Sequence, residues 1–189
     1  MINWFNHPKV CRAATLLQNE GVVAYPTEAV WGLGCDPCSE AAVGKILRLK
    51  RRAEAKGLIL IASHIDQFAP FLQGLDEDHR ARMLEDYSKP ITWLVPDNGT
   101  APDWIVGEHS TVALRITAHP VAAALCTLFA GPLVSTSANP QGLPAAINGL
   151  KVKSYFGQGI DYLAPGAVGS SRQASEIRNL ITSEVIRPG

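Results

Sequence analysis

Residues 39–62 read SEAAVGKILRLKRRAEAKGLILIA, a helix pattern followed closely by a strand pattern. Ser39 is a typical N-cap, and apolar residues then recur at helical spacing as far as Lys50. Residues 58–62 form a continuous apolar run, which is typical of a strand covered on both faces. A buried strand so soon after an amphipathic helix predicts an α/β fold built around a sheet.

The rest of the chain repeats this alternation of helices and strands. Further helices are expected over residues 7–19, 66–86 and 120–129. Further strands are expected over residues 22–25, 91–95, 111–117, 132–135, 162–164 and 184–186, with a loop over 97–107 and a last third otherwise rich in loops. We therefore predict a single domain over residues 1–189 with a mixed α/β (α+β) architecture.

The composition narrows the class of protein. The 189 residues include 47% hydrophobic and 18% charged residues, and the formal net charge is zero. A neutral chain has no general attraction for nucleic acids or membranes. The first residues lack the basic-then-apolar layout of a secretory signal, and no apolar run approaches the roughly 20 residues that span a bilayer. We expect a cytoplasmic protein without membrane contact.

Basic residues nevertheless gather in one segment, residues 45–56. They are Lys45, Arg48, Lys50, Arg51, Arg52 and Lys56, against Glu54 alone. Lys50 continues the apolar stripe of its helix, so its ammonium points toward the core or a cleft, where an unpaired charge is costly. A bound phosphate would relieve that cost. Two alternatives stay open, because the basic residues could complement the helix dipole or the segment could bind RNA.

A second polar segment, STSAN at residues 135–139, comes at the end of the strand expected at 132–135. Ligands of open α/β sheets gather at the carboxyl ends of strands, where hydroxyl and amide groups can hold phosphate or ribose oxygens. Together with the basic segment it predicts a polyanionic substrate such as a nucleotide. Arg115 lies on the polar face of the strand expected at 111–117. It forms either a structural ion pair or a bidentate contact with a substrate carboxylate.

Cys35 and Cys38 form one C-x-x-C pair just before the helix that starts after Ser39. Tetrahedral zinc needs four ligands, and the sequence has neither a second such pair nor a histidine close by. A redox pair is the alternative, since such motifs precede helices. We predict two loop cysteines without function and no metal site.

Several motifs follow one another in a definite order. They are YPTEAVWGLG at residues 25–34, the pair Lys50 and Arg52, VALRI at 112–116 followed by His119 and Pro120, SAN at 137–139, SEI at 175–177 and IRPG at 186–189. In these motifs the chain resembles the YrdC family of threonylcarbamoyl-AMP synthases, in its short single-domain form, over essentially its whole length. The resemblance implies a YrdC/RibB-like fold, with a twisted mixed sheet flanked by helices around a concave, positively charged cavity.

The resemblance also implies a reaction, in which L-threonine, bicarbonate and ATP give threonylcarbamoyl-adenylate and pyrophosphate. Such a nucleotidyltransferase supplies the threonylcarbamoyladenosine modification of tRNA. The implied ATP-binding residues are Lys50, Arg52, Lys56, Thr111, Ser137, Asn139 and Arg187, with Lys50 and Arg52 as the catalytic pair. The implied threonine-binding residues are Thr27, Arg115, Ser135 and Ser175. Mg²⁺ is expected on the phosphates, and the further expected partners are tRNA or double-stranded RNA and downstream threonylcarbamoyl-transferases.

Overall fold

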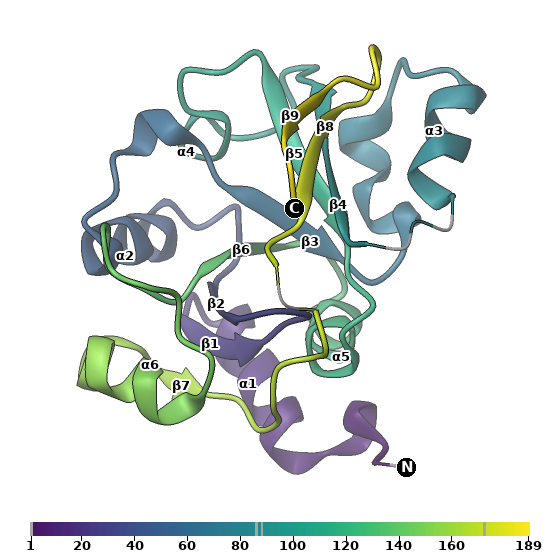
Figure 1. Cartoon of the computed structure of the whole chain (residues 1–189). Coiled ribbons are helices and arrows are strands. Elements are labelled where there is room, and N and C mark those ends of the chain that lie inside the picture. Colours follow the sequence, from purple (N-terminus) through teal and green to yellow (C-terminus); the bar gives the residue numbers. More distant parts are fainter. Residues whose placement is uncertain (1, 86, 88, 172) are drawn as a thin grey trace.

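The computed structural model describes residues 2–85, 87, 89–171 and 173–189. Its strands are β1 (Val23–Pro26), β2 (Trp31–Gly34), β3 (Ile59–Ala62), β4 (Ile91–Pro96), β5 (Thr111–Ile116), β6 (Leu133–Ser137), β7 (Tyr162–Leu163), β8 (Glu176–Asn179) and β9 (Val185–Arg187). Within the described residues these nine strands form one mixed sheet in the order β7-β1-β2-β6-β3-β5-β4-β8-β9 (Figure 1). Parallel pairs join β1 to β7, β3 to β5 and β4 to β8, and the other neighbours are antiparallel.

Helices and short 3₁₀ segments connect the strands. The α-helices are α1 (Pro8–Gln18), α2 (Glu40–Lys50), α3 (Glu77–Leu84), α4 (Asp103–Val106), α5 (Pro120–Phe129) and α6 (Gly149–Phe156). The 3₁₀ segments are η1 (Trp4–Asn6), η2 (Glu54–Lys56), η3 (Ile65–Leu72) and η4 (Gly157–Gly159). None of the helices in the described part of the chain combines the length and the apolar run that crossing a membrane requires.

The sheet separates two hydrophobic clusters. On one face, Val10 of α1 and Leu125 of α5 belong to the same cluster as Ile61 of β3. On the other face, Ile46 of α2 clusters with Leu60, the preceding residue of β3. Leu60 and Ile61 are both fully buried, and burying a side chain of this size contributes about 2 kcal/mol. The predicted coverage of this strand on both faces is therefore confirmed, as is the mixed α/β fold class.

The helix that the sequence predicts after Ser39 is confirmed. The Ser39 hydroxyl oxygen accepts a hydrogen bond from the amide of Ala42 at 3.2 Å, which caps α2. The buried residues of α2 are Ala42, Val43, Ile46, Leu47 and Lys50. The helix ends because Arg51 adopts the left-handed conformation, with φ 53° and ψ 43°. Lys50 thus points inward, as its helical phase predicts.

Most of the other predicted elements are found with small shifts of their ends. The helices expected at 7–19 and 120–129 are α1 and α5, and the strands expected at 22–25, 91–95 and 111–117 are β1, β4 and β5. In β5 the predicted alternation holds as far as Arg115, since Val112 and Leu114 are buried while Ala113 and Arg115 are less so. It fails at the end, where Ile116 is half-buried and Thr117 is buried. The strands expected at 162–164 and 184–186 are the short edge strands β7 and β9.

The stretch expected to be helical over residues 66–86 contains two separate helical segments, η3 and α3. Pro70 lies inside η3, and a proline removes a backbone donor that a longer α-helix needs. The chain then starts a new helix, α3, whose N-cap Asp76 accepts a hydrogen bond from the amide of His79 at 2.9 Å. Asp86, the last residue of the predicted helix, lies outside the described residues.

Strand β2 was not expected, because Gly32 and Gly34 argue against a strand. Gly34 is required by close packing, since a Cβ at this position would lie 2.4 Å from the carbonyl oxygen of Val134. Gly32 pairs with Ser137, so β6 runs two residues further than predicted. Thr136 and Ser137 therefore lie within a strand rather than after it.

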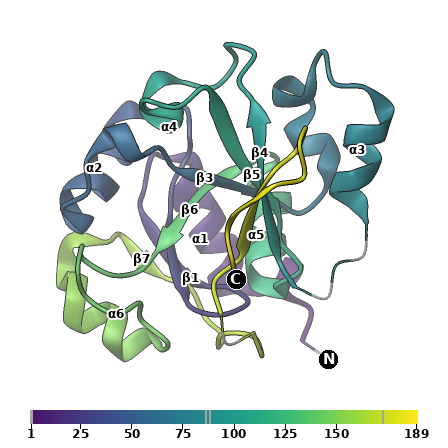
Figure 2. The same ribbon diagram turned by 45° about the horizontal axis from the view of Figure 1, so that its top comes forward.

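Three further elements also fall in predicted loops. Helix α4 interrupts the loop expected at 97–107, and α6 and β8 lie in the loop-rich last third. The side chain of Asn148 caps α6 by accepting a hydrogen bond from the amide of Lys151 at 2.9 Å, a local signal that the sequence does contain. Strand β8 carries no such signal, because it is formed by pairing with the distant β4. In Figures 1 and 2 the yellow C-terminal strands β8 and β9 lie next to β4, at one edge of the sheet.

Candidate active site

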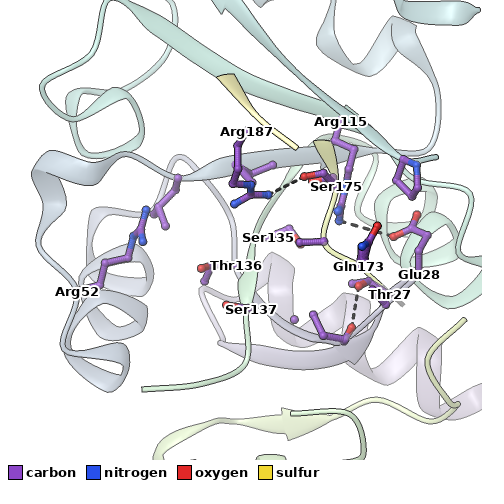
Figure 3. Close-up of a pocket in the computed structure, with 17 residues that line it drawn as sticks. Thr27, Glu28, Arg52, Arg115, Ser135, Thr136, Ser137, Gln173, Ser175 and Arg187 are labelled. Atoms are coloured by element: carbon purple, nitrogen blue, oxygen red, sulfur yellow. Dashed lines mark hydrogen bonds and ion pairs between the residues drawn. The ribbon is translucent and has the colours of Figure 1, made fainter. Parts of the chain in front are cut away.

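A cavity of about 210 Å³, here called the main cavity, lies over the centre of the sheet (Figure 3). The β1–β2 turn, the start of β3, β5, β6, residues 173–175 and β9 contribute to its wall. Seven of the residues predicted from the sequence line it, namely Thr27, Arg52, Arg115, Ser135, Ser137, Ser175 and Arg187. The fold thus brings together side chains that are far apart in the sequence.

Two further cavities adjoin the main cavity. The basic cavity, of about 190 Å³, is lined by Lys50, Arg52, Lys56, Ser137, Asn139, Gln141 and Gly142. The apolar cavity, of about 260 Å³, has a largely aliphatic wall that includes Leu94, Ile105, Val106, Ile177 and Ile186, and Lys56, Thr111 and Arg187 also line it. Arg52 lines all three cavities. Each of the eleven predicted residues lines at least one of them.

Hydroxyl groups are fixed in the wall of the main cavity. The Thr27 hydroxyl donates to the carbonyl oxygen of Val30 at 2.7 Å and closes the β1–β2 turn. The hydroxyls of Ser175 and Thr92 lie 2.7 Å apart, so β4 holds the segment that carries Ser175. Ser135 lies within β6, in register with Ile59 of β3. Thr27, Ser135 and Ser175 are buried residues, which limits the orientations that their hydroxyls can take.

Arg115 extends from β5 into the main cavity and is 11% exposed. Its nearest counter-ion is Glu28, whose Oε2 lies 3.8 Å from Nη2 of Arg115, too far for a hydrogen bond. Within the described residues, Nε of Arg115 is buried without a hydrogen-bond partner. The structure therefore contains the ion pair that the sequence left open, and the same arginine lines the main cavity.

Lys50 lies where α2 reaches the loop after β6. Its ammonium donates to the carbonyl oxygen of Ser137 and, at 2.9 Å, to that of Asn139. This corrects the expectation of an unpaired charge, because two backbone acceptors already hold the ammonium. Burial, followed by repulsion from Arg52, still lowers the pKa of Lys50 to about 8. An anion beside Lys50 would favour its charged form.

The left-handed conformation of Arg51 allows this residue to point away from the site while its two neighbours point into it. Arg51 is exposed, whereas Lys50 and Arg52 both line the basic cavity. Arg52 donates through Nη2 to the carbonyl oxygens of Lys56 at 3.1 Å and Gly57 at 2.9 Å. Burial lowers the pKa of Arg52 below its usual value. The local turn therefore aims two cations at neighbouring parts of one site.

The SAN segment forms its own network of hydrogen bonds. The Ser137 hydroxyl donates to Oδ1 of Asn139 at 2.6 Å. The Asn139 side chain in turn donates to the carbonyl oxygen of Leu143 at 2.6 Å, which shapes the loop beside the basic cavity. The hydrogen bonds to Ser137 and Leu143 fix the position of the Asn139 side chain. The lone pairs of the Ser137 hydroxyl remain able to accept a hydrogen bond.

Arg187 comes from the last strand, β9. Its Nη2 donates to the carbonyl oxygen of Ser175 at 2.7 Å, which ties the two C-terminal parts of the cavity wall together. Burial and the nearby Arg115 lower the pKa of Arg187. Arg187 lines both the main and the apolar cavity, so it lies at their boundary.

Three polar or glycine residues of the main cavity are not indicated as site residues by the sequence. These are Glu28, Gly32 and Gln173. Glu28 and Gly32 belong to the YPTEAVWGLG motif. This motif carries the family resemblance but does not by itself indicate that these two residues line a cavity. Thr136 belongs to the STSAN segment that the sequence indicated, and it also lines the main cavity. Gln173 lies in a connecting segment without a local signal.

The C-x-x-C pair lies away from these cavities. Cys35 is buried, Cys38 is exposed, and both are free. Burial, and then the charge of Asp36, raises the pKa of each thiol. In the part of the chain that the structure describes, no three His, Cys, Asp or Glu side chains are grouped so as to hold a metal ion. The pair shows no feature of a reactive thiolate.

Known proteins share both the sequence and the fold. The Sua5/yciO/yrdC family model, described as "Telomere recombination", matches residues 15–189. A threonylcarbamoyl-AMP synthase from Cellvibrio japonicus is 51% identical over 188 residues, covering 100% of both chains.

Solved structures extend the comparison. The structure of P. abyssi Sua5 complexed with L-threonine is 28% identical with a TM-score of 0.87, and the match covers 95% of this chain but 54% of the Sua5 chain. E. coli YciO is 20% identical with a TM-score of 0.81, covering 94% of this chain and 87% of that one, a likeness of fold. The predicted family resemblance is confirmed, and the chain belongs to the Sua5/YciO/YrdC family.

Proposed function

We propose that the protein is a threonylcarbamoyl-AMP synthase, which condenses L-threonine, bicarbonate and ATP to threonylcarbamoyl-adenylate and pyrophosphate. The observation that carries the proposal is the meeting of the main, basic and apolar cavities at Arg52. A reaction that joins an amino acid derivative to a nucleotide needs neighbouring sites for three chemically different groups. The name of the C. japonicus relative supports the same activity.

Each cavity suits one part of the substrates. Thr27, Arg115, Ser135 and Ser175 in the main cavity would bind threonine, with Arg115 on its carboxylate. The basic cavity would hold phosphates through Lys50, Arg52, Ser137 and Asn139. The aliphatic wall of the apolar cavity would take the adenine base, with Lys56, Thr111 and Arg187 at its polar edge. The L-threonine in the Sua5 complex is consistent with the first of these assignments.

The chemistry follows from this arrangement. The threonine ammonium releases a proton to solvent, and the free amine attacks bicarbonate to give a carbamate and water. A carbamate oxygen then attacks the α-phosphorus of ATP, and the bond to the β-phosphate breaks to release pyrophosphate. The phosphoryl step requires no proton transfer, so positioning and neutralisation of charge dominate. Lys50 and Arg52 are the groups that would stabilise the phosphate charge.

Mg²⁺ has no protein cage among the described residues. The cavity carboxylate of Glu28 already accepts hydrogen bonds from Thr117 and Ala118, and no cluster of metal ligands is found in the described ranges. The donors present therefore do not fit a resident metal. We propose that Mg²⁺ arrives as part of the nucleotide substrate, held by phosphates and water.

The RNA-binding alternative rests on the basic segment at residues 45–56. Lys50 and Arg52 of this segment line the cavities, and Lys45 pairs with Asp161 at 2.6 Å. Arg48, Arg51 and Lys56 remain exposed. The proposed function also includes three further expectations. They are contact with tRNA or double-stranded RNA, delivery of the adenylate to downstream transferases for tRNA modification, and a cytoplasmic location.

The test is pyrophosphate release by the purified protein with each substrate omitted in turn. The proposal expects release that needs threonine, bicarbonate and ATP together. Pyrophosphate release without threonine would contradict it. RNA affinity that falls steeply with salt, in a protein without turnover, would favour the RNA-binding alternative.

A further inference from the structure

Glu28 carries the carboxylate of the main cavity. The described residues that line this cavity also include three guanidinium groups, those of Arg52, Arg115 and Arg187. In Figure 3 Arg52 lies at one end of the cavity and Glu28 at the other, with Arg115 beside Glu28. No substrate contact was predicted for Glu28 from the sequence, so its place among these cations calls for an explanation.

The carboxylate of Glu28 is fixed by its surroundings. Its Oε1 accepts hydrogen bonds from the Thr117 hydroxyl at 2.6 Å and from the Ala118 amide at 3.1 Å, both just after β5. The backbone carbonyl oxygen of Glu28 accepts from the amide of Ser171 at 3.1 Å. Glu28 therefore braces the β1–β2 turn against the end of β5 and against the segment that leads to Ser175.

This brace leaves the second carboxylate oxygen facing Arg115. Oε2 of Glu28 has no hydrogen-bond partner among the described residues, and it lies 3.8 Å from Nη2 of Arg115. Burial raises the pKa of Glu28, but Arg115 and the Thr117 hydroxyl lower it more, so the net pKa lies below its ordinary value. Glu28 is thus charged at neutral pH, and it offsets the repulsion between Arg115 and Arg187.

We propose that Glu28 is a positioning residue for threonine: it holds the guanidinium of Arg115 in the orientation that binds the amino acid's carboxylate. This inference rests on the proposed function. The attraction between Oε2 of Glu28 and Nη2 of Arg115, 3.8 Å apart, favours one orientation of a guanidinium that also lines the main cavity. A bidentate contact depends on the angle of the guanidinium plane, so a loose Arg115 would bind a carboxylate less well.

The direction of the reaction supports this role over direct contact with the substrate amine. The carbamate forms on the threonine nitrogen and must reach the phosphate near Arg52, at the far end of the cavity from Glu28 (Figure 3). The nitrogen therefore points away from Glu28, and the carboxylate of threonine points toward Arg115. Glu28 acts through Arg115 and has no part in proton transfer.

The test compares Glu28→Gln with Glu28→Asp and with Glu77→Gln, an exposed control on α3. Glu28→Gln keeps the shape and the acceptor for Thr117 but removes the charge facing Arg115. We expect its threonine KM to rise at least tenfold, with the ATP KM within twofold of the wild-type value. Glu28→Asp keeps the charge and should recover part of the loss, and Glu77→Gln should match the wild type.

Several outcomes would overturn the inference. An unchanged threonine KM in Glu28→Gln would do so, and so would an equal rise in both KM values. If Glu28→Gln fails to fold by circular dichroism, Thr117→Val takes its place, because it removes one hydrogen bond from Oε1 and keeps the charge; it must then raise the threonine KM selectively. A wild-type protein without threonine-dependent pyrophosphate release would instead refute the proposed function.

Discussion

Replacing Lys50 with methionine should change both catalysis and the pH dependence of stability. The Lys50 ammonium is buried beside two carbonyl oxygens, and its pKa is lowered to about 8 from an ordinary value of 10.5. Below pH 8 the side chain is charged in the folded and unfolded states alike. Between pH 8 and 10.5 the unfolded chain binds the proton more strongly, so stability rises with pH. The shift corresponds to about 3 kcal/mol over this window.

Activity should depend on pH in the opposite sense. Charged Lys50 is the form that stabilises phosphate, so kcat/KM for ATP should fall as pH rises through about 8. Lys50→Met should lower kcat/KM at pH 7 by at least tenfold, or about 1.4 kcal/mol of transition-state stabilisation. Lys50→Arg keeps its charge at every accessible pH, so its residual activity should lose the fall near pH 8.

The assay combines denaturant unfolding of the wild type and Lys50→Met from pH 7 to 10 with initial rates across the same range. The difference between the two unfolding free energies isolates Lys50 from other groups that titrate. If this difference stays constant with pH, folding does not lower the pKa of Lys50, and burial of the charged ammonium does not reduce the free energy of unfolding. A fall in activity near pH 8 that persists in Lys50→Arg would assign that fall to another group.

Other predictions concern single residues. Arg115→Lys keeps the charge but loses bidentate geometry, and should raise the threonine KM at least tenfold and more than the ATP KM; the reverse order would reassign Arg115. Arg51→Gly relieves the left-handed conformation, so denaturant unfolding should show a stability gain of up to about 1 kcal/mol with activity unchanged, and a loss would count against strain there. The double change Cys35→Ala/Cys38→Ser should leave kcat/KM within twofold of the wild-type value. Loss of activity with an intact fold would show that the pair has a function.

Local features of the sequence predicted much of the fold. The stripe that ends at Lys50 is set by helical periodicity, so its inward direction could be derived from neighbouring residues alone. The apolar run at residues 58–62 also needed only neighbouring residues to predict a strand buried on both faces. By contrast, β6 extends to Ser137 because it pairs with β2, and a long-range pairing leaves no local trace.

In the candidate site, too, some features could be predicted from the sequence and others could not. Residue types and the family resemblance indicated Arg115 and the hydroxyls of Ser135 and Ser175, which do lie together in the main cavity. The partners that orient them could not be predicted, since they depend on tertiary packing. Glu28 faces Arg115 only because the β1–β2 turn meets the end of β5. The carbonyl oxygens that hold Lys50 come from the end of β6 and the loop after it, far along the chain.

The proposed function requires one connected site that joins threonine, bicarbonate and ATP. It is tested most directly by the mass of the nucleotide product after the wild-type protein is incubated with threonine, ATP and isotope-labelled bicarbonate. We expect threonylcarbamoyl-AMP that carries one labelled carbon, formed in equal amount with pyrophosphate and absent when any substrate is omitted. Hydrolysis of ATP without labelled carbon in an adenylate would contradict it.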